Sequence, residues 1–179
     1  VRGGKTFYDT ILYTHYGPVV FDETFRPESR LCDYAMKWTA HDPSLEQKTF
    51  YLRNKAGKYQ EYVEALSYYD CPAQNFIFAS VKNEIAITVN GKFPVKWKEQ
   101  GKFLMDGSVS AHEWQTFIPR DQLPRSYNPA RGFLFSANQY PVDSLYPYYV
   151  YDYNYEDFRN RRIYDRLTAM KKPIDIEAM

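Results

Sequence analysis

"QNFIFASVKNEIAITVNGKFP", residues 74–94, has the clearest secondary-structure pattern in the chain. Two runs rich in β-branched and aromatic residues flank Lys82-Asn83, a polar pair typical of a turn. We therefore predict an antiparallel hairpin. Its apolar side is predicted to carry Ile77, Ile85, Ile87 and Val89.

The amino-terminal side of this hairpin alternates between extended and helical patterns. Residues 11–21 and 31–38 predict strands, and the first of them contains a Gly-Pro break. Residues 41–66 predict two helices separated at Gly57. Asp42 is a suitable N-cap because a proline follows it at the first helical position.

On the carboxyl-terminal side, a loop is predicted over residues 98–112 and an irregular segment with three prolines over 113–130. Residues 132–139, "GFLFSANQ", predict a further strand. The spacing of apolar residues predicts a helix over 155–171 with its basic side in water. These apolar residues are Phe158, Ile163, Leu167 and Met170. No linker divides the chain, so residues 1–179 are interpreted as one α+β segment.

Charge and hydropathy exclude several classes of protein. The chain carries 23 Lys and Arg against 22 Asp and Glu, without the basic excess that nucleic-acid binding requires. No apolar run approaches the roughly 18 to 20 residues that cross a bilayer, and the start has no signal-peptide core. Neither nucleic acid nor membrane is an expected partner. Cys32 and Cys71 are too few for a disulfide framework and are interpreted as core thiols.

Tyrosine and phenylalanine are abundant, with 18 and 12 residues. The stretch "YPYYVYDYNY" could form a platform that stacks on sugars, because tyrosine combines an aromatic face with a polar tip. It could equally line an interface with other polypeptide segments, and this second interpretation is favoured.

Local motifs alone do not identify an active site. His15, His41 and His112 lie far apart and lack the ligand spacing of a zinc site. Ser108 lacks the strand-turn-helix setting of a nucleophile elbow. The amide pair Asn138-Gln139 is more informative, because an unpartnered buried amide costs about 1 to 3 kcal/mol. Such residues complete a hydrogen-bond network or perform a task.

Several phrases, read in order, resemble the β-subunit of the penicillin acylase family. They are "HYGPVV", "EYVEAL", "CPAQNFIFAS", "GKFP", "EWQTFIP", "LPRSYNPARGFLFSANQ", "YPYY" and "FRNRRI". The resemblance covers nearly all 179 residues. Its most specific part is Asn128-Pro129, Gly132 and Ala137-Asn138, followed by an arginine-bearing helix.

This resemblance implies an amidohydrolase of the N-terminal-nucleophile class, cleaving an N-acyl amide bond of a small substrate. The implied fold is part of an αββα sandwich, with mainly antiparallel strands and two or three helices. In this class the first residue of the β-subunit attacks the acyl carbon and its own α-amine acts as the base. Val1 has no nucleophilic atom, so the chain is expected to be an internal β-subunit segment that is inactive alone. The other α- and β-subunit segments are its expected partners, in the periplasm or outside the cell.

The resemblance also assigns roles to residues. Asn138 matches the residue whose amide stabilises the oxyanion, and Arg159 matches the arginine that orders groups around the nucleophile. Phe50 matches an aromatic of the acyl pocket, and a core position on a helix explains it equally well. No cofactor is required. Structural calcium accompanies many family members, but no metal ligand is assigned, because the spacing of Asp152 does not match. The alternative function is a noncatalytic, aromatic-rich module that binds glycans.

Overall fold

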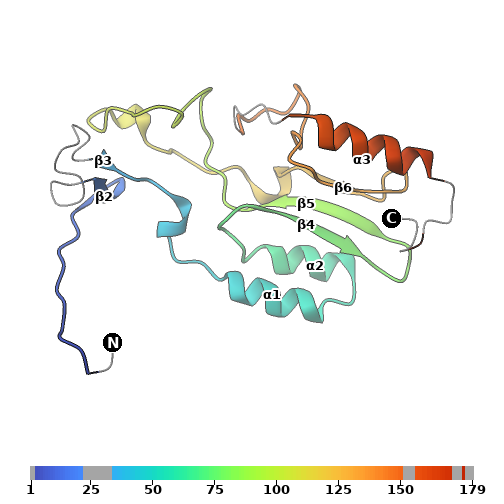
Figure 1. Ribbon diagram of the computed structural model, residues 1–179, viewed down its shortest axis with the longest axis horizontal. Helices are drawn as coiled ribbons and strands as arrows, with labels where there is room; N and C mark the ends of the chain where they lie inside the picture. Colours follow the sequence, from blue (N-terminus) through green and yellow to red (C-terminus); the bar gives the residue numbers. More distant parts are fainter. Residues whose placement is uncertain (1–2, 22–33, 151–155, 171–174, 176–179) are drawn as a thin grey trace. The chain divides into compact units, whose positions relative to one another are not determined.

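The structure is a computed structural model (Figure 1). It describes residues 3–21, 34–150, 156–170 and 175. Two compact units make up the chain: the first joins residues 1–43 to 105–113, and the second joins 44–104 to 114–179. Each unit combines segments that are distant in the sequence, so no single linker marks the division. No helix among the described residues is long and apolar enough to cross a membrane.

The first unit contains a three-stranded antiparallel sheet with the order β1-β2-β3. Its strands are β1 (Tyr13–Thr14), β2 (Gly17–Phe21) and β3 (Tyr34–Ala35). The extended character predicted for residues 11–21 is confirmed. Of the strand predicted over 31–38, Tyr34 and Ala35 pair with β2, while residues 31–33 lie outside the described residues.

Gly17 explains the predicted Gly-Pro break. Its φ is +134°, and a Cβ at this position would lie 2.3 Å from the Met36 carbonyl oxygen. Only glycine tolerates both conditions. The glycine therefore begins β2 directly after the turn at His15 and Tyr16 rather than ending a strand.

The second unit is built on a three-stranded antiparallel sheet with the order β4-β5-β6. The predicted hairpin is confirmed by β4 (Gln74–Ala79) and β5 (Ile85–Asn90), which pair from Gln74↔Asn90 to Ala79↔Ile85. The third strand, β6 (Arg125–Tyr127), corrects the prediction that 113–130 is irregular throughout. Pro124 and Pro129 lie on either side of β6. Among the described strands β6 pairs only with β5, and prolines are tolerated at such an edge.

The two faces of this sheet correct the predicted apolar side. Ile77, Ile85, Ile87 and Val89 do share one face, but Ile77 is 58% exposed and the other three are half-buried. The core lies against the opposite face, where Phe76 and Ala86 are buried. Both faces of the hairpin carry apolar residues, so alternation alone could not identify the core side.

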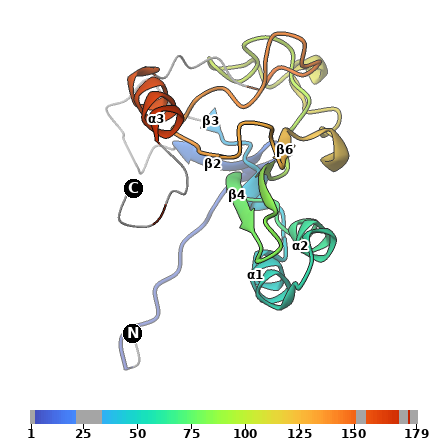
Figure 2. The ribbon, with the colours of Figure 1, turned by 90° about the vertical axis from the view of Figure 1, so that its right-hand side faces the viewer.

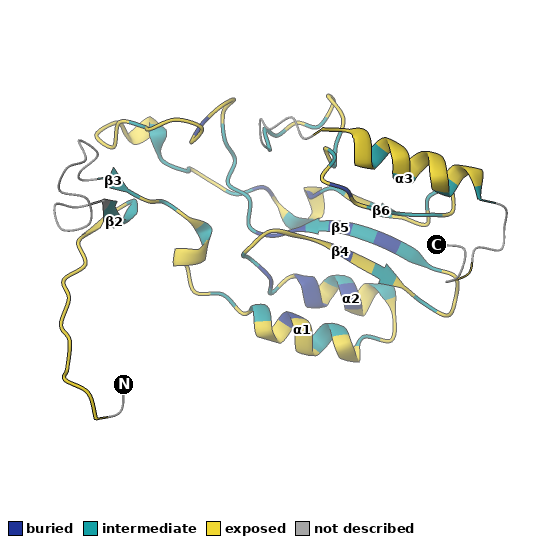
Figure 3. Cartoon of the chain, in the orientation of Figure 1, coloured by how far each residue is buried: buried dark blue, intermediate teal, exposed yellow. Residues whose placement is uncertain are grey.

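Two helices cover the core face, as Figure 3 shows by burial. They are α1 (Glu46–Lys55) and α2 (Tyr59–Leu66), so the predicted helix, break, helix around Gly57 is confirmed. Tyr62, Leu66 and Tyr69 pack with Phe76 in one buried cluster. Burial raises the pKa of Tyr62 to about 12, and its hydroxyl donates to the Ile77 carbonyl at 3.0 Å.

The start of α1 differs from the prediction. Asp42 ends a short 3₁₀ helix, Thr39–His41, and does not cap α1, which begins at Glu46 after Leu45. One oxygen of the Glu46 carboxylate accepts from the Ser44 hydroxyl at 2.5 Å. The same oxygen accepts the backbone N–H groups of Asp70 and Cys71 at 3.2 and 3.1 Å. Glu46 thus ties the first turn of α1 to the segment that leads into β4.

These contacts make the Glu46 carboxylate a pH-dependent link. The Ser44 hydroxyl, followed by the backbone N–H groups of Glu46, Cys71 and Asp70, lowers the pKa of Glu46 to about 2. Because the folded pKa is below the unfolded one, the stabilisation is present above about pH 4.5 and is lost as the pH falls towards 2.

We therefore expect Glu46→Gln to lower the free energy of unfolding of the parent protein by about 1 kcal/mol at pH 7, because a neutral amide accepts weaker hydrogen bonds. The deficit should shrink as the pH is lowered from about 4.5, as measured by urea unfolding. Glu64→Gln, on the exposed side of α2, is the control and should show little change. A Glu46→Gln deficit that is constant down to pH 2.5 would contradict this role of the carboxylate.

The third helix, α3 (Phe158–Ala169), lies on the other side of the sheet from α1 and α2 (Figures 1 and 2). It confirms the predicted helix, although Tyr155 and Lys171 lie outside the described residues. Ile163 and Leu167 are half-buried, but Phe158 is 74% exposed and corrects the predicted apolar side. The described part of residues 98–112 has turns and one 3₁₀ turn, as the loop prediction requires.

Candidate functional site

The site forms around residues 132–139, which the structure does not show as a strand. Residues 133–136 have no regular secondary structure and no ladder partner, and a bend follows at Ala137 and Asn138. Asn138 has a φ of +63°, in the left-handed region that Asn adopts more readily than most residues. The strand prediction was wrong because an apolar run specifies burial and not pairing.

Gln139 holds this bend in place. Its side-chain oxygen accepts the Ala137 N–H at 2.6 Å, and its side-chain nitrogen donates to the Phe135 carbonyl at 3.2 Å. One amide group therefore satisfies two backbone groups next to Asn138. Of the amide pair noted in the sequence, Gln139 completes a hydrogen-bond network.

Helix α3 holds the bend from the other side. Arg159, in the first turn of α3, donates from one guanidinium nitrogen to the Asn138 side-chain oxygen and, at 3.4 Å, to the Ala137 carbonyl. One helical turn later, Tyr164 meets the ring of Phe133 edge-on at 6.1 Å. The structure thus brings together Asn138 and Arg159, two of the predicted site residues.

Pairing with arginine fixes which way the Asn138 amide faces. A guanidinium has only donors, so it must meet the oxygen of the amide and not its nitrogen. Asn138 is exposed, and among the described residues its Nδ2 group donates to no acceptor. Two N–H bonds therefore remain available at an exposed position, held by a partner on a helix. A side-chain donor that is fixed before a reaction begins can stabilise negative charge.

Phe50, the third predicted site residue, is not part of this arrangement. It lies on α1 and meets Tyr69 edge-on at 6.0 Å, and Tyr69 packs on Phe76. Asn75 faces the opposite side of the sheet from Phe76, and its side chain donates to Ser136, beside the bend. The sheet therefore separates Phe50 from Asn138. Its role in substrate binding stays a prediction.

Three other residues considered in the sequence have partners within the fold. His15 pairs with Glu113 at 3.3 Å, and the Ser108 hydroxyl donates to Asp106 at 2.7 Å. His112 contacts the Asp106 carbonyl. Within the described ranges no three His, Cys, Asp or Glu residues gather as a metal site would require. Asp152 and Cys32 lie outside the described residues, and Cys71 is a half-buried free thiol.

The tyrosine-rich stretch is described as far as Tyr149 and Val150. Tyr146 donates its hydroxyl to the Gln122 carbonyl, and Tyr148 donates to the Gln122 side chain. Both rings are half-buried and meet edge-on at 5.6 Å. These two tyrosines are used within the fold and do not form a flat platform for stacking on a sugar.

Comparison with known proteins gives one consistent result. The sequence model of the family described as penicillin amidase matches residues 1–179. Penicillin acylase 2 proenzyme from Pseudomonas sp. (strain SE83) is 25% identical over 169 residues, which are 94% of this chain and 21% of that protein. Acyl-homoserine lactone acylase QuiP from Pseudomonas syringae pv. syringae (strain B728a) is 23% identical over 146 residues, 82% of this chain and 18% of that protein.

The structural comparison agrees. Thermostable penicillin G acylase from Alcaligenes faecalis matches with a TM-score of 0.68 and 22% identity, over 99% of this chain and 31% of that one. The α+β prediction is confirmed, and the chain has part of the N-terminal-nucleophile hydrolase fold. It spans about a fifth of the curated relatives and about a third of the solved chain.

Proposed function

Because the chain belongs to the penicillin amidase family, we propose that it is part of an amide hydrolase that cleaves N-acyl substrates, and that it contributes the amide of Asn138 to catalysis. The observation that carries this proposal is the orientation of Asn138. Arg159 occupies the oxygen of the amide, and the nitrogen is left to donate. The relatives named as acylases supply the reaction class.

In the proposed reaction, a nucleophile from another segment of the parent protein attacks the acyl carbon of the substrate. The carbonyl π electrons move to the oxygen, which becomes negatively charged, and Asn138 Nδ2–H donates to it. When the tetrahedral intermediate collapses, the C–N bond breaks and the amine leaves with a proton returned by the base. Water then hydrolyses the acyl-enzyme. Arg159 acts through Asn138 by holding its oxygen.

The remaining α- and β-subunit segments are the proposed partners. Several large apolar side chains are exposed and would be covered by such segments. Examples are Trp97 at 50%, Phe103 at 69% and Leu104 at 69%. The family relationship also supports a location in the periplasm or outside the cell. Residues 1–179 alone are proposed to have no hydrolase activity.

The proposal is tested by amine release. The parent protein is incubated with N-acyl aromatic amides, acyl homoserine lactones and acylated amino acids, and free amine is measured. Turnover of at least one class by the parent protein, and none by residues 1–179 alone, is expected. No turnover of any class, together with saturable binding of a glycan by the isolated segment, would favour a noncatalytic module instead.

A further inference from the structure

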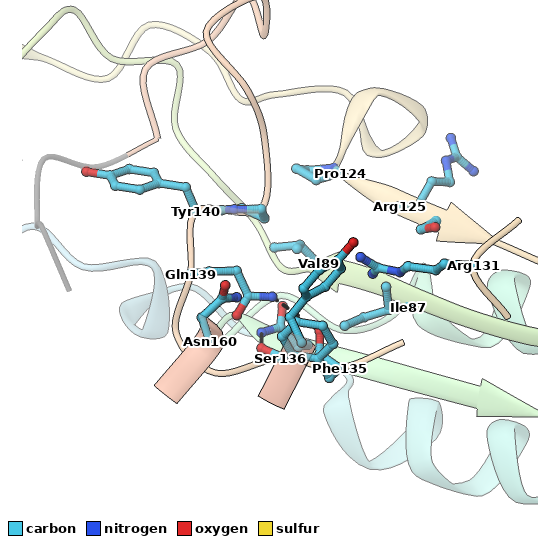
Figure 4. Close-up of a pocket in the computed structure, with 14 residues that line it drawn as sticks. Ile87, Val89, Pro124, Arg125, Arg131, Phe135, Ser136, Gln139, Tyr140 and Asn160 are labelled. Atoms are coloured by element: carbon cyan, nitrogen blue, oxygen red, sulfur yellow. Dashed lines mark hydrogen bonds between the residues drawn. The ribbon is translucent and has the colours of Figure 1, made fainter. Parts of the chain in front are cut away.

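A cavity of about 310 Å³ lies between the sheet and α3 (Figure 4). This volume is at the lower end of the range for small-molecule sites, about 300 to 1,000 Å³. Its floor includes Ile87 and Val89 of β5, on the sheet face opposite the core. Gln139 and Asn160, the chain neighbours of Asn138 and Arg159, also line it. The cavity therefore adjoins the candidate site.

The charge of the lining is one-sided. Arg125 and Arg131 both belong to it, and none of the described residues that line the cavity is acidic. In Figure 4 the guanidinium of Arg131 points into the cavity, whereas that of Arg125 points away from it. Arg125 donates to the Asp121 carbonyl. Arg131 is thus the cation that faces the cavity.

Arg131 is exposed, and three contacts orient its guanidinium. Its Nε donates to the Phe133 carbonyl at 2.9 Å. The centre of its guanidinium lies 5.2 Å from the ring of Phe133 and 5.5 Å from the ring of Phe135, within the range of cation–π contacts. Among the described residues, neither of its terminal nitrogens has a hydrogen-bond acceptor or an acidic partner. Those two nitrogens form the edge that binds a carboxylate in bidentate fashion.

Neighbouring groups add further donors. The Ser136 oxygen accepts from Asn75 at 2.7 Å, which leaves the hydroxyl proton of Ser136 available. Asn160 of α3 is half-buried and lines the cavity, and no described residue accepts from its side-chain amide. Ile87, Val89 and Phe135 provide an apolar surface beside these donors. The lining thus combines the oriented guanidinium of Arg131, the donors of Ser136 and Asn160, and an apolar wall.

We propose that this cavity binds a carboxylate attached to an apolar body, and that Arg131 is the residue that recognises the carboxylate. In the parent enzyme the cavity is a subsite for an acidic group of the substrate or product. That role as a subsite rests on the proposed function, whereas binding of the carboxylate does not.

The test is equilibrium binding to the parent protein by calorimetry, with benzoate as the probe and benzamide as the neutral probe of the same shape. We expect benzoate to bind more tightly than benzamide. Arg131→Gln should weaken benzoate binding about 10-fold or more and leave benzamide unchanged, because it removes a charged bidentate contact. The control is Arg125→Gln, which removes a cavity-lining arginine that points elsewhere. It should change benzoate binding less than about twofold.

Three results would overturn the proposal. The first is equal loss of benzoate binding in both variants, which would show a general effect of positive charge. The second is no preference of the wild type for benzoate over benzamide. The third is a lower melting temperature of the Arg131→Gln parent protein with unchanged benzoate binding. That result would show that an acidic residue of another segment pairs with the Arg131 guanidinium. All three can be obtained whether or not the parent protein hydrolyses amides, so they do not depend on the proposed reaction.

Discussion

Replacing Asn138 with alanine is expected to lower kcat for amide hydrolysis by the parent protein about 10² to 10³-fold, with a much smaller change in KM. The physical reason is that the Nδ2–H group meets negative charge that exists only when the acyl oxygen becomes an oxyanion. Arg159 holds the Asn138 side chain before the reaction, and the Gln139 side chain fixes the bend that carries it. Loss of the Asn138 amide therefore removes a donor that water cannot replace with the same orientation.

Backbone strain has to be separated from loss of the donor, because Asn138 has a positive φ. Asn138→Gly relieves that strain and should be as inactive as Asn138→Ala. Asn83 in the β4-β5 turn has nearly the same φ, +61°, far from any proposed chemistry, so Asn83→Ala is the matched control. Near-normal turnover by Asn138→Gly would show that the position needs a left-handed backbone and not an amide.

Arg159→Met is expected to lower kcat about 10 to 100-fold, because an amide that is no longer held spends less time in the productive orientation. Methionine keeps much of the aliphatic volume and removes every donor. Arg159→Lys keeps the charge without the planar fork and should fall between the wild type and the methionine variant.

A double-mutant cycle distinguishes positioning from a general structural role. If Arg159 acts only through Asn138, Arg159→Met should have almost no further effect on kcat when Asn138 is already alanine. Independent, multiplying losses would contradict the arrangement in which the arginine holds the amide oxygen. Melting temperatures of the four proteins show whether any loss reflects unfolding.

Local patterns predicted the second unit well where one pattern dominated. The β4-β5 hairpin followed from two β-rich runs around a polar turn, and the helix pair followed from periodicity interrupted at Gly57. The buried side of the hairpin could not be predicted, because Phe76 and Ile77 are both apolar and only the packing of α2 selects between them. Asp42 failed as a helix cap because Glu46, through contacts with residues distant in the sequence, fixes where α1 begins.

The sequence named candidate site residues but not how they are arranged. Asn138 and Arg159 were matched by resemblance, and the structure adds the direct contact between them. The only sequence feature that indicated the hydrogen bonds of Gln139 to the bend was the unusual amide pair after an apolar run. No sequence pattern pointed to Arg131. Its orientation depends on the rings of Phe133 and Phe135 and on the Phe133 carbonyl, whose positions secondary-structure propensity does not predict.

Asn138→Asp separates donation to an oxyanion from pairing with Arg159. Aspartate has nearly the same shape and, as an anion, accepts a stronger hydrogen bond from Arg159, so the fold of the bend should be kept or stabilised. It has no N–H to give, and its charge opposes an oxyanion. The measurement is kcat of the parent protein carrying this change, beside its melting temperature. We predict a loss of about 10²-fold or more at an unchanged or higher melting temperature. Turnover within about threefold of the wild type would show that Asn138 serves only to pair with the arginine, and would contradict its role as the oxyanion donor.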